Sequence, residues 1–351
     1  MTGQETKYEH AVQAVFNTPW AILPSVYATI CEIVRMRAEG HRFTAAEIQE
    51  RIGAAPVRAG AARNGPVAVI PLFGILAQRM NLMTAMSGGT STELFGRAFQ
   101  AALADPEVSA IVIDIDSPGG SVFGVAELGQ LIYDARGQKP VIAQANSQAA
   151  SAAYWVASQA DEIVVTPSGE VGSIGVIAHH QDISVAEEMQ GVKDTLVTYG
   201  DNKAIANPFE PLSESAQAYL QKRADEYGVM FDQAVARGRG VSAARVRAKF
   251  GQGLMFGAEE AVKLGMADRV GTLQQTLDRL TGRRSARSGA RAELDPNELQ
   301  WAMCGGCGER LGPRHPTDCP ENDGGAETQL DAADIVWEAE LIDLRARRLR
   351  C

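Results

Sequence analysis

Residues 110–121 read AIVIDIDSPGGS. The first six are dense in β-branched residues, which is typical of a buried strand in a parallel sheet. Gly119 and Gly120 allow a tight turn, and a helical pattern follows over 121–135. Adjacent glycines at such a junction can present backbone N–H groups to a ligand, as an oxyanion hole requires. The same residues also suit an ordinary strand-to-helix turn, so both interpretations stay open here.

Strand and helix patterns alternate on both sides of this stretch. Apolar runs predict strands over 67–71, 141–145, 162–165 and 173–178. Helical spacing predicts helices over 92–104, 151–158, 213–237, 242–249 and 258–264. This alternation predicts a layered α/β domain whose strands are largely parallel and buried.

The chain is expected to form one large domain with appendages. We predict a helical N-terminal arm over 1–52, in which Thr44 and Glu47 have the spacing of a capping box. A linker over 53–65 leads to the main domain over 66–280. A second linker over 281–297 leads to a C-terminal tail over 298–351 that contains an amphipathic helix at 331–348.

Composition limits the possible partners. The 351 residues include 33 Lys and Arg against 43 Asp and Glu, a formal net charge of -10. This charge argues against a general attraction to nucleic acid. The apolar stretch 21–34 is interrupted by Pro24 and Glu32 and is shorter than the roughly 20 residues that cross a bilayer. We therefore expect protein partners, no membrane anchor and a cytoplasmic location.

A second motif, residues 145–155, reads ANSQAASAAYW. Ser151 lies among small residues where a predicted strand gives way to a helix. Small neighbours let a substrate backbone approach, and a helix N-terminus favours a developing negative charge. A helix N-cap is the common alternative role for a serine at such a junction.

A serine nucleophile needs a base. Of the five histidines, only His179 and His180 lie in the predicted α/β region. A lysine that partial burial keeps neutral is another established base. Lys203 is the leading candidate and His180 the alternative, although Lys203 without its context would be a solvated loop charge.

Four blocks in order resemble the S49 peptidases, which include signal peptide peptidase A and its phage relatives. The blocks are residues 116–121, ASAAY around Ser151, GSIGV over 172–176, and 200–208 with Lys203. The resemblance runs from about Val67 to Leu273. It implies a ClpP/crotonase-like layered fold of repeated ββα-type units and a homo-oligomeric ring.

The resemblance also implies a serine endopeptidase with a Ser-Lys dyad. Ser151 would be the nucleophile and Lys203 the base, with an oxyanion hole formed by the backbone N–H groups of Gly120 and Ala152. No cofactor is expected for catalysis. The family usually has two glycines after its nucleophile, where this chain has Ala152 and Ala153, and their small size is expected to preserve activity.

The substrate is expected to bind as an added strand along the segment from Gly119 to Ser121. His180, Asp182 and the stretch NPFEPL at 207–212 resemble the phage-borne branch of the family. Enzymes of that branch cleave scaffold and head proteins during procapsid maturation. The resemblance therefore implies phage scaffold or head proteins as substrates, in the host cytoplasm or inside a procapsid.

Two other functions are compatible with the same fold. One is a non-catalytic scaffold or capsid-assembly protein, which a fluorophosphonate probe would fail to label at Ser151. The other is a crotonase-type acyl-CoA enzyme, which would need an acidic base and an adenine pocket. The sequence signals neither of these two features.

The C-terminal tail carries a separate candidate site. Cys304, Cys307, His315 and Cys319 offer four ligands in a spacing that could enclose a structural zinc ion. The alternative is an unstructured tail with incidental cysteines, and the family resemblance does not extend to this segment.

Overall fold

The computed structural model describes residues 62–79 and 89–282. Of the N-terminal part it describes residues 18–38 together with Val15, His41, Phe43, Thr44, Glu47 and Ile48. The chain divides into two compact units between Ser285 and Ala286, and every described residue belongs to the first. The predicted C-terminal tail and most of both predicted linkers lie outside the described residues.

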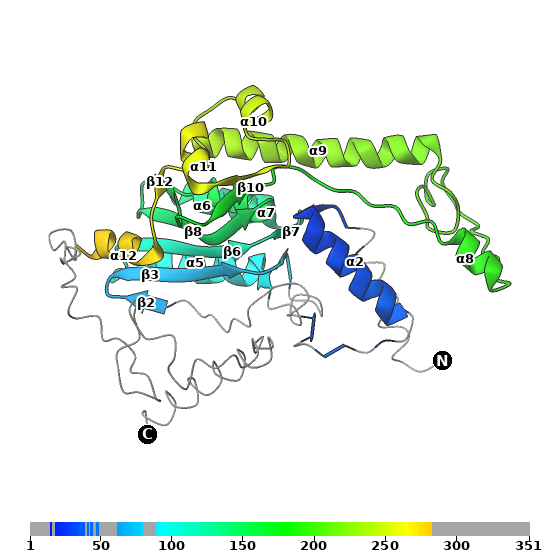
Figure 1. The fold of residues 1–351 in the computed structure, drawn as a ribbon, viewed down its shortest axis with the longest axis horizontal. Coiled ribbons are helices and arrows are strands. Elements are labelled where there is room, and N and C mark those ends of the chain that lie inside the picture. The colour runs from blue at the N-terminus through cyan, green and yellow to red at the C-terminus, as the bar shows by residue number, and fades with distance from the viewer. Residues whose placement is uncertain are drawn as a thin grey trace, which may run out of the picture. The chain divides into compact units, whose positions relative to one another are not determined.

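Strands and helices alternate through the first unit (Figure 1). The strands are β1 (Trp20–Ile22), β2 (Ala62–Asn64), β3 (Val67–Phe73), β4 (Leu76–Ala77), β5 (Thr90–Ser91), β6 (Ala110–Ser117), β7 (Gly119–Ser121), β8 (Val141–Ala150), β9 (Glu162–Val165), β10 (Glu170–Gly172), β11 (Met255–Gly257) and β12 (Arg269–Val270). The helices are α2 (Pro24–Ala38), α5 (Thr92–Ala104), α6 (Val125–Asp134), α7 (Ala152–Ala157), α8 (Ser184–Met189), α9 (Glu214–Arg239), α10 (Ala243–Lys249), α11 (Ala258–Leu264) and α12 (Leu273–Thr281).

The main sheet has the order β11-β10-β8-β6-β3-β2, and β9 pairs with β8 and with β12. Strands β3, β6, β8 and β10 run parallel, whereas β2 and β11 are antiparallel at the ends of the order.

Alternate residues of β6 face two different layers. Ile111, Ile113 and Ile115 join the core that also contains buried residues of α5, α6, α7 and α9, and Val112 packs in the cluster of Leu277 from α12. The sheet is therefore covered on both faces, as its apolar strands predicted.

A second sheet has the order β1-β7-β4-β5. The chain passes from β3 of the main sheet to β4 of the second sheet, and likewise from β6 to β7, before helices α5 and α6. These are two ββα units, so the predicted α/β class with repeated ββα units is confirmed. The capping box is confirmed too, because Thr44 N–H donates to Glu47 Oε2 over 2.6 Å and Glu47 N–H donates to Thr44 Oγ1 over 3.3 Å.

Two predicted elements are wrong. The helix expected from Ser121 begins only at Val125, because residues 119–121 pair in the second sheet as β7. The strand expected over 173–178 lies earlier, as β10, and after it only an isolated bridge joins Ile177 to Trp20. Long-range pairing overrides the local pattern in both places. Strand β1, which pairs with β7, was not predicted at all.

Helix α7 is held on several sides. The Tyr154 hydroxyl donates to the Met266 carbonyl over 2.8 Å, and the Trp155 ring stacks on Phe231 of α9 with centroids 4.7 Å apart. The Arg136 guanidinium donates to backbone carbonyls in the segment that follows α7 and to one in α9, those of Ser158, Gln159, Ala160 and Gly238. All six residues of α7 are buried.

Among the described helices, none has both the length and the apolar character needed to cross a membrane.

Phe231→Ala should lower the free energy of unfolding by about 3–5 kcal/mol, because it leaves a cavity beside Trp155. Tyr219→Ala on the same helix should cost less than about 1 kcal/mol, because its side chain is exposed. Urea denaturation of both variants measures the difference. Equal losses would contradict the assigned role of the Trp155–Phe231 stack.

Asp114 on β6 is buried, and its Oδ1 atom has no hydrogen-bond partner among the described residues. Burial raises the pKa of this carboxyl from 3.8 to about 6, and the nearby charge of Asp116 adds to the shift. Because the folded-state pKa is raised, stability is lost as the pH rises through about 6. Asp114→Asn should therefore stabilise the protein by about 1–3 kcal/mol above that pH.

This gain should shrink as the pH falls toward 3.8, where the wild-type carboxyl is increasingly protonated. Denaturant unfolding of Asp114→Asn and wild type across this pH range tests the prediction. The exposed Asp134→Asn is the control. A stabilisation by Asp114→Asn that does not depend on pH would refute the electrostatic cause.

Candidate active site

The turn from β6 into β7 is built by Ser117 and two glycines. The Ser117 hydroxyl is buried and donates to the Gly74 carbonyl over 2.6 Å, and Gly119 N–H donates back to Ser117 Oγ over 3.2 Å. Gly119 has a φ of 99°, a conformation that side chains disfavour. The turn is thus fixed by a serine that cannot reach solvent.

Neither glycine has room for a side chain. A Cβ on Gly119 would collide with the Ala21 carbonyl oxygen and would lie 3.0 Å from Ser151 Cβ. A Cβ on Gly120 would collide with the backbone of Leu76. The structure therefore brings the Gly119–Gly120 turn directly beside Ser151.

Ser151 is the single residue between β8 and α7, and its backbone is strained. Its φ is 53° and its ψ is -118°, an uncommon conformation for a residue with a side chain. Such a conformation costs on the order of 1–3 kcal/mol and persists only where the surroundings enforce it. Ser151 N–H donates to the Gly172 carbonyl over 2.7 Å, and Trp155 N–H donates to the Ser151 carbonyl over 2.9 Å.

The Ser151 hydroxyl is buried and makes no hydrogen bond to any described residue. Ser151 occupies the N-cap position of α7, but its side chain makes no capping bond. The role of a structural cap therefore does not explain this serine. A buried hydroxyl without a partner costs free energy, which favours a role with an incoming group.

The predicted oxyanion donors belong to two elements next to Ser151, helix α7 and strand β7. Ala152 is the first residue of α7, so its N–H has no partner within the helix. Gly120 is in β7, next to the glycine that touches Ser151. The free edge of β7 that was expected to receive substrate, from Gly119 to Ser121, is paired with β1.

Lys203 is not joined to Ser151. It lies in residues 178–212, called the excursion below, which lead from Ile177 to the N-cap of α9. The Lys203 side chain is exposed, and among the described residues no hydrogen bond or ion pair links it to Ser151. Figure 1 shows that α9 extends beyond the sheet and that α8, within the excursion, lies near its far end.

His180, the alternative base, has a local role in the structure. Its Nε2 atom is 2.9 Å from the Asn207 carbonyl oxygen. Ile183 N–H donates to the Pro208 carbonyl over 2.8 Å, and the Asn207 side chain closes the loop through Ala204 and Glu210. These bonds hold the two halves of the excursion together. The pKa of Asp182 is lowered mainly by the hydrogen bonds it accepts from the side chain and backbone of Ser184.

The excursion carries an apolar surface. Its exposed large apolar side chains include Met189, which is 85% exposed, and Val197, which is 94% exposed. The others are Val185, Val192, Leu196, Tyr199 and Leu212. They make up half of the exposed large apolar side chains among the described residues. Exposed apolar side chains gathered in one segment make the excursion a candidate for contact with a partner.

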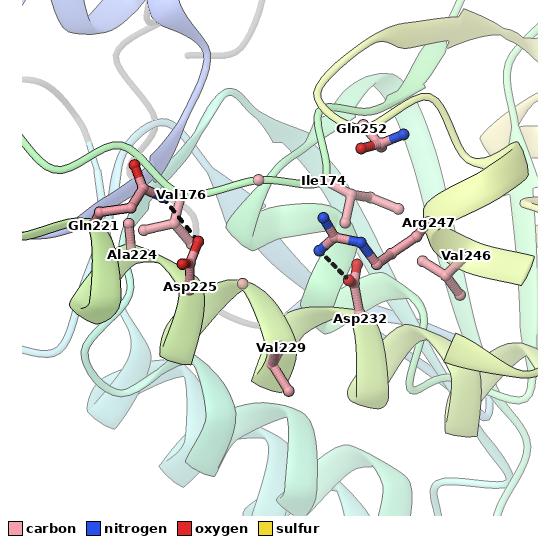
Figure 2. Close-up of a pocket in the computed structure, with 12 residues that line it drawn as sticks. Ile174, Val176, Gln221, Ala224, Asp225, Val229, Asp232, Val246, Arg247 and Gln252 are labelled. Carbon is pink, nitrogen blue, oxygen red and sulfur yellow. Dashed lines mark hydrogen bonds and ion pairs between the residues drawn. The ribbon is translucent and has the colours of Figure 1, made fainter. Parts of the chain in front are cut away.

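A pocket of about 420 Å³ lies between α9 and the chain segment that follows β10 (Figure 2). Ile174 and Val176 line one side of it, and they follow Gly172, whose carbonyl binds Ser151 N–H. The α9 side contains Asp232, which pairs with Arg247 of α10 over 3.3 Å. Burial raises the pKa of the Asp232 carboxyl despite this partner.

Two parts of the site were missed by sequence reasoning. Gly172, which binds the Ser151 N–H, was noted only within a family block, and the pairing of β1 with β7 leaves no local signal. The predicted zinc ligands Cys304, Cys307, His315 and Cys319 lie outside the described residues. Within the described part of the chain, no three His, Cys, Asp or Glu side chains are grouped so as to hold a metal.

Comparison with known proteins found a matching family model, similar proteins and similar solved structures. The family model "Peptidase family S49" matches residues 134–286. The "Head-tail preconnector protein GP5" of Enterobacteria phage P21 is 32% identical over 277 residues, which are 74% of this chain and 54% of that protein. This chain thus spans about half of that relative. A solved structure of a "1510-N membrane-bound stomatin-specific protease" mutant is 18% identical, with 62% of this chain and 85% of that chain covered and a TM-score of 0.38.

The chain is also similar to the "Capsid assembly protease C" of Escherichia phage lambda. The two are 31% identical over 312 residues, which are 83% of this chain and 70% of that protein. Together with the family model over residues 134–286, this similarity shows that the chain belongs to peptidase family S49.

Proposed function

We propose that this protein is a serine endopeptidase in which Ser151 attacks a peptide carbonyl. The observation that carries the proposal is the Ser151 hydroxyl, which is buried, without a partner and set on a strained backbone beside two glycines. Structural roles do not account for this combination, whereas a serine held ready for an incoming carbonyl does. Membership of peptidase family S49 supports the same activity.

The reaction follows from the groups around Ser151. A neutral lysine accepts the hydroxyl proton as Ser151 Oγ bonds to the carbonyl carbon. In this proposal the N–H groups of Gly120 and Ala152 hold the resulting oxyanion. The peptide C–N bond then breaks, the amine leaves with the proton, and water hydrolyses the acyl-enzyme to return the serine.

We assign the base to Lys203, delivered by a second copy of the chain. Lys203 is exposed in one chain, and the excursion that bears it carries an apolar surface suited to a partner. A head-to-tail contact that repeats around a ring would give each Ser151 the Lys203 of a neighbour. This arrangement requires an assembled, homo-oligomeric enzyme.

The natural substrates in this proposal are phage head or scaffold proteins, cleaved during capsid maturation. Two similar proteins carry names that refer to capsid assembly and to the head-tail preconnector. The host cytoplasm or the interior of a procapsid would be the place of action. The acidic net charge of -10 agrees with protein rather than nucleic acid as the partner.

Ser151→Ala should lower cleavage of co-expressed head proteins by at least about 10⁴-fold, because the nucleophile is lost. Mass spectrometry of the head proteins and labelling with a fluorophosphonate probe measure the loss. Ser147→Ala, four residues away and exposed, is the control and should keep activity and labelling. Undiminished cleavage by Ser151→Ala would overturn the assignment, and unlabelled wild type would favour a non-catalytic scaffold.

Ser151→Ala and Lys203→Ala should each be inactive alone but should restore activity when co-expressed. In mixed rings about a quarter of the sites combine an intact Ser151 with an intact Lys203 of the neighbour. Cleavage of a reporter peptide by purified mixed rings measures this recovery. A mixture that stays inactive would place both residues of the dyad in one subunit.

His180→Ala tests the alternative base in the same assay. It should keep most of its activity, since His180 bonds to Asn207 within the excursion. A loss as large as that of Lys203→Ala, in a variant that still assembles, would make His180 the base.

A further inference from the structure

The chain's own strand β1 lies along the edge of β7. The two are antiparallel, with Trp20 opposite Ser121, Ala21 opposite Gly120, and Ile22 opposite Gly119. Leu23 N–H donates to the Pro118 carbonyl over 2.9 Å at one end, and Val122 N–H donates to the Pro19 carbonyl over 3.2 Å at the other.

Hydrogen-bonded pairs alternate along an antiparallel ladder. The pairs at both ends of β1 are hydrogen-bonded pairs. Two residues inward from either end, the next hydrogen-bonded pair is Ala21 with Gly120. In that pair Gly120 N–H points to the Ala21 carbonyl oxygen. This N–H is the group that we assign to the oxyanion hole, so Ala21 presents its carbonyl where a scissile carbonyl would lie.

Two further contacts place β1 in the position of a bound peptide. On its other edge, Trp20 and Ile177 exchange two backbone hydrogen bonds of 2.9 and 2.7 Å. The Ala21 carbonyl oxygen and Ser151 Cβ both lie close to the position that a Cβ on Gly119 would occupy. The strand thus lies between two stretches of backbone and next to the nucleophile, the geometry of β-strand addition.

The side chains of β1 alternate as those of a bound strand should. Ala21 is fully buried and belongs to the main core, whereas Trp20 and Ile22 belong to a separate cluster with Tyr27 and Ile30 of α2. The position beside Ser151 therefore holds a small side chain. The large apolar side chains on either side of it anchor the strand to α2.

We propose that residues 19–23 occupy the substrate position and keep the site closed until they are displaced. This inference rests on the proposed function. It also names the substrate class: an extended segment with a small residue at the place of Ala21. Displacement has a structural route, because Tyr27 Oη lies 2.8 Å from His179 Nδ1 at the start of the excursion. In this proposal, docking of a second copy on the excursion breaks the Tyr27–His179 contact and so loosens α2 and β1.

Ala21→Arg tests this proposal, because a long charged side chain cannot stay in the buried position and would expel β1. The matched control is Ala28→Arg on the exposed side of α2, which should behave as wild type. The measurement is the rate at which a fluorophosphonate probe labels Ser151 in the full chain. Ala21→Arg should be labelled on the order of tenfold faster or more, because the rate scales with the fraction of open sites.

A synthetic peptide of residues 15–24 added to Ala21→Arg should slow labelling again, and the same peptide with arginine at position 21 should not. Cleavage of the wild-type peptide after Ala21 would also support the proposal. If Ala21→Arg and wild type are labelled at equal rates while Ser151→Ala is not labelled, the strand does not close the site. If no variant is labelled, the proposed function fails and the inference fails with it.

Discussion

The close approach of four backbone segments at Gly119 and Gly120 is the constraint on which the rest of the structure depends. Leu76, Ala21 and the Ser151 junction fill the space that side chains would take. Because neither glycine has a side chain, the chain can leave β6 in the main sheet and begin β7 in the second sheet within two residues. Ser151 is then held where the two sheets meet, against a turn that the buried Ser117 hydroxyl keeps rigid.

Local patterns predicted much of this frame. The helix over 92–104, the central strand that begins at Ala110 and the helix over 258–264 carry strong periodicity and were found as expected. The strand expected over 173–178 was misplaced because its apolar residues line a pocket and meet Trp20 rather than extend the sheet. Strand β1 could not be read from its three residues, since its partner lies almost 100 positions away in sequence.

The sequence predicted one part of the candidate site better than the other: the residues around Ser151 lie together, whereas Lys203 does not join them. Ser151, Ala152 and the two glycines are adjacent in space because short connections between neighbouring elements determine their places. Lys203 is exposed in the excursion and is not bonded to Ser151, so neither the sequence nor one copy of the fold brings it to the serine. In this proposal a single chain is inactive for two reasons. Its Lys203 does not reach Ser151, and its own strand β1 occupies the substrate position. Assembly could then control where and when proteolysis begins.

The pairing of β1 with β7 has a consequence for solubility as well as for catalysis. An uncovered strand edge offers unpaired N–H and carbonyl groups to any passing chain, and native proteins cover or distort such edges. Here the short edge at Gly119–Ser121 is covered by the chain itself. A molecule whose arm is removed would be open to its substrate, but it would also expose a site for edge-to-edge aggregation.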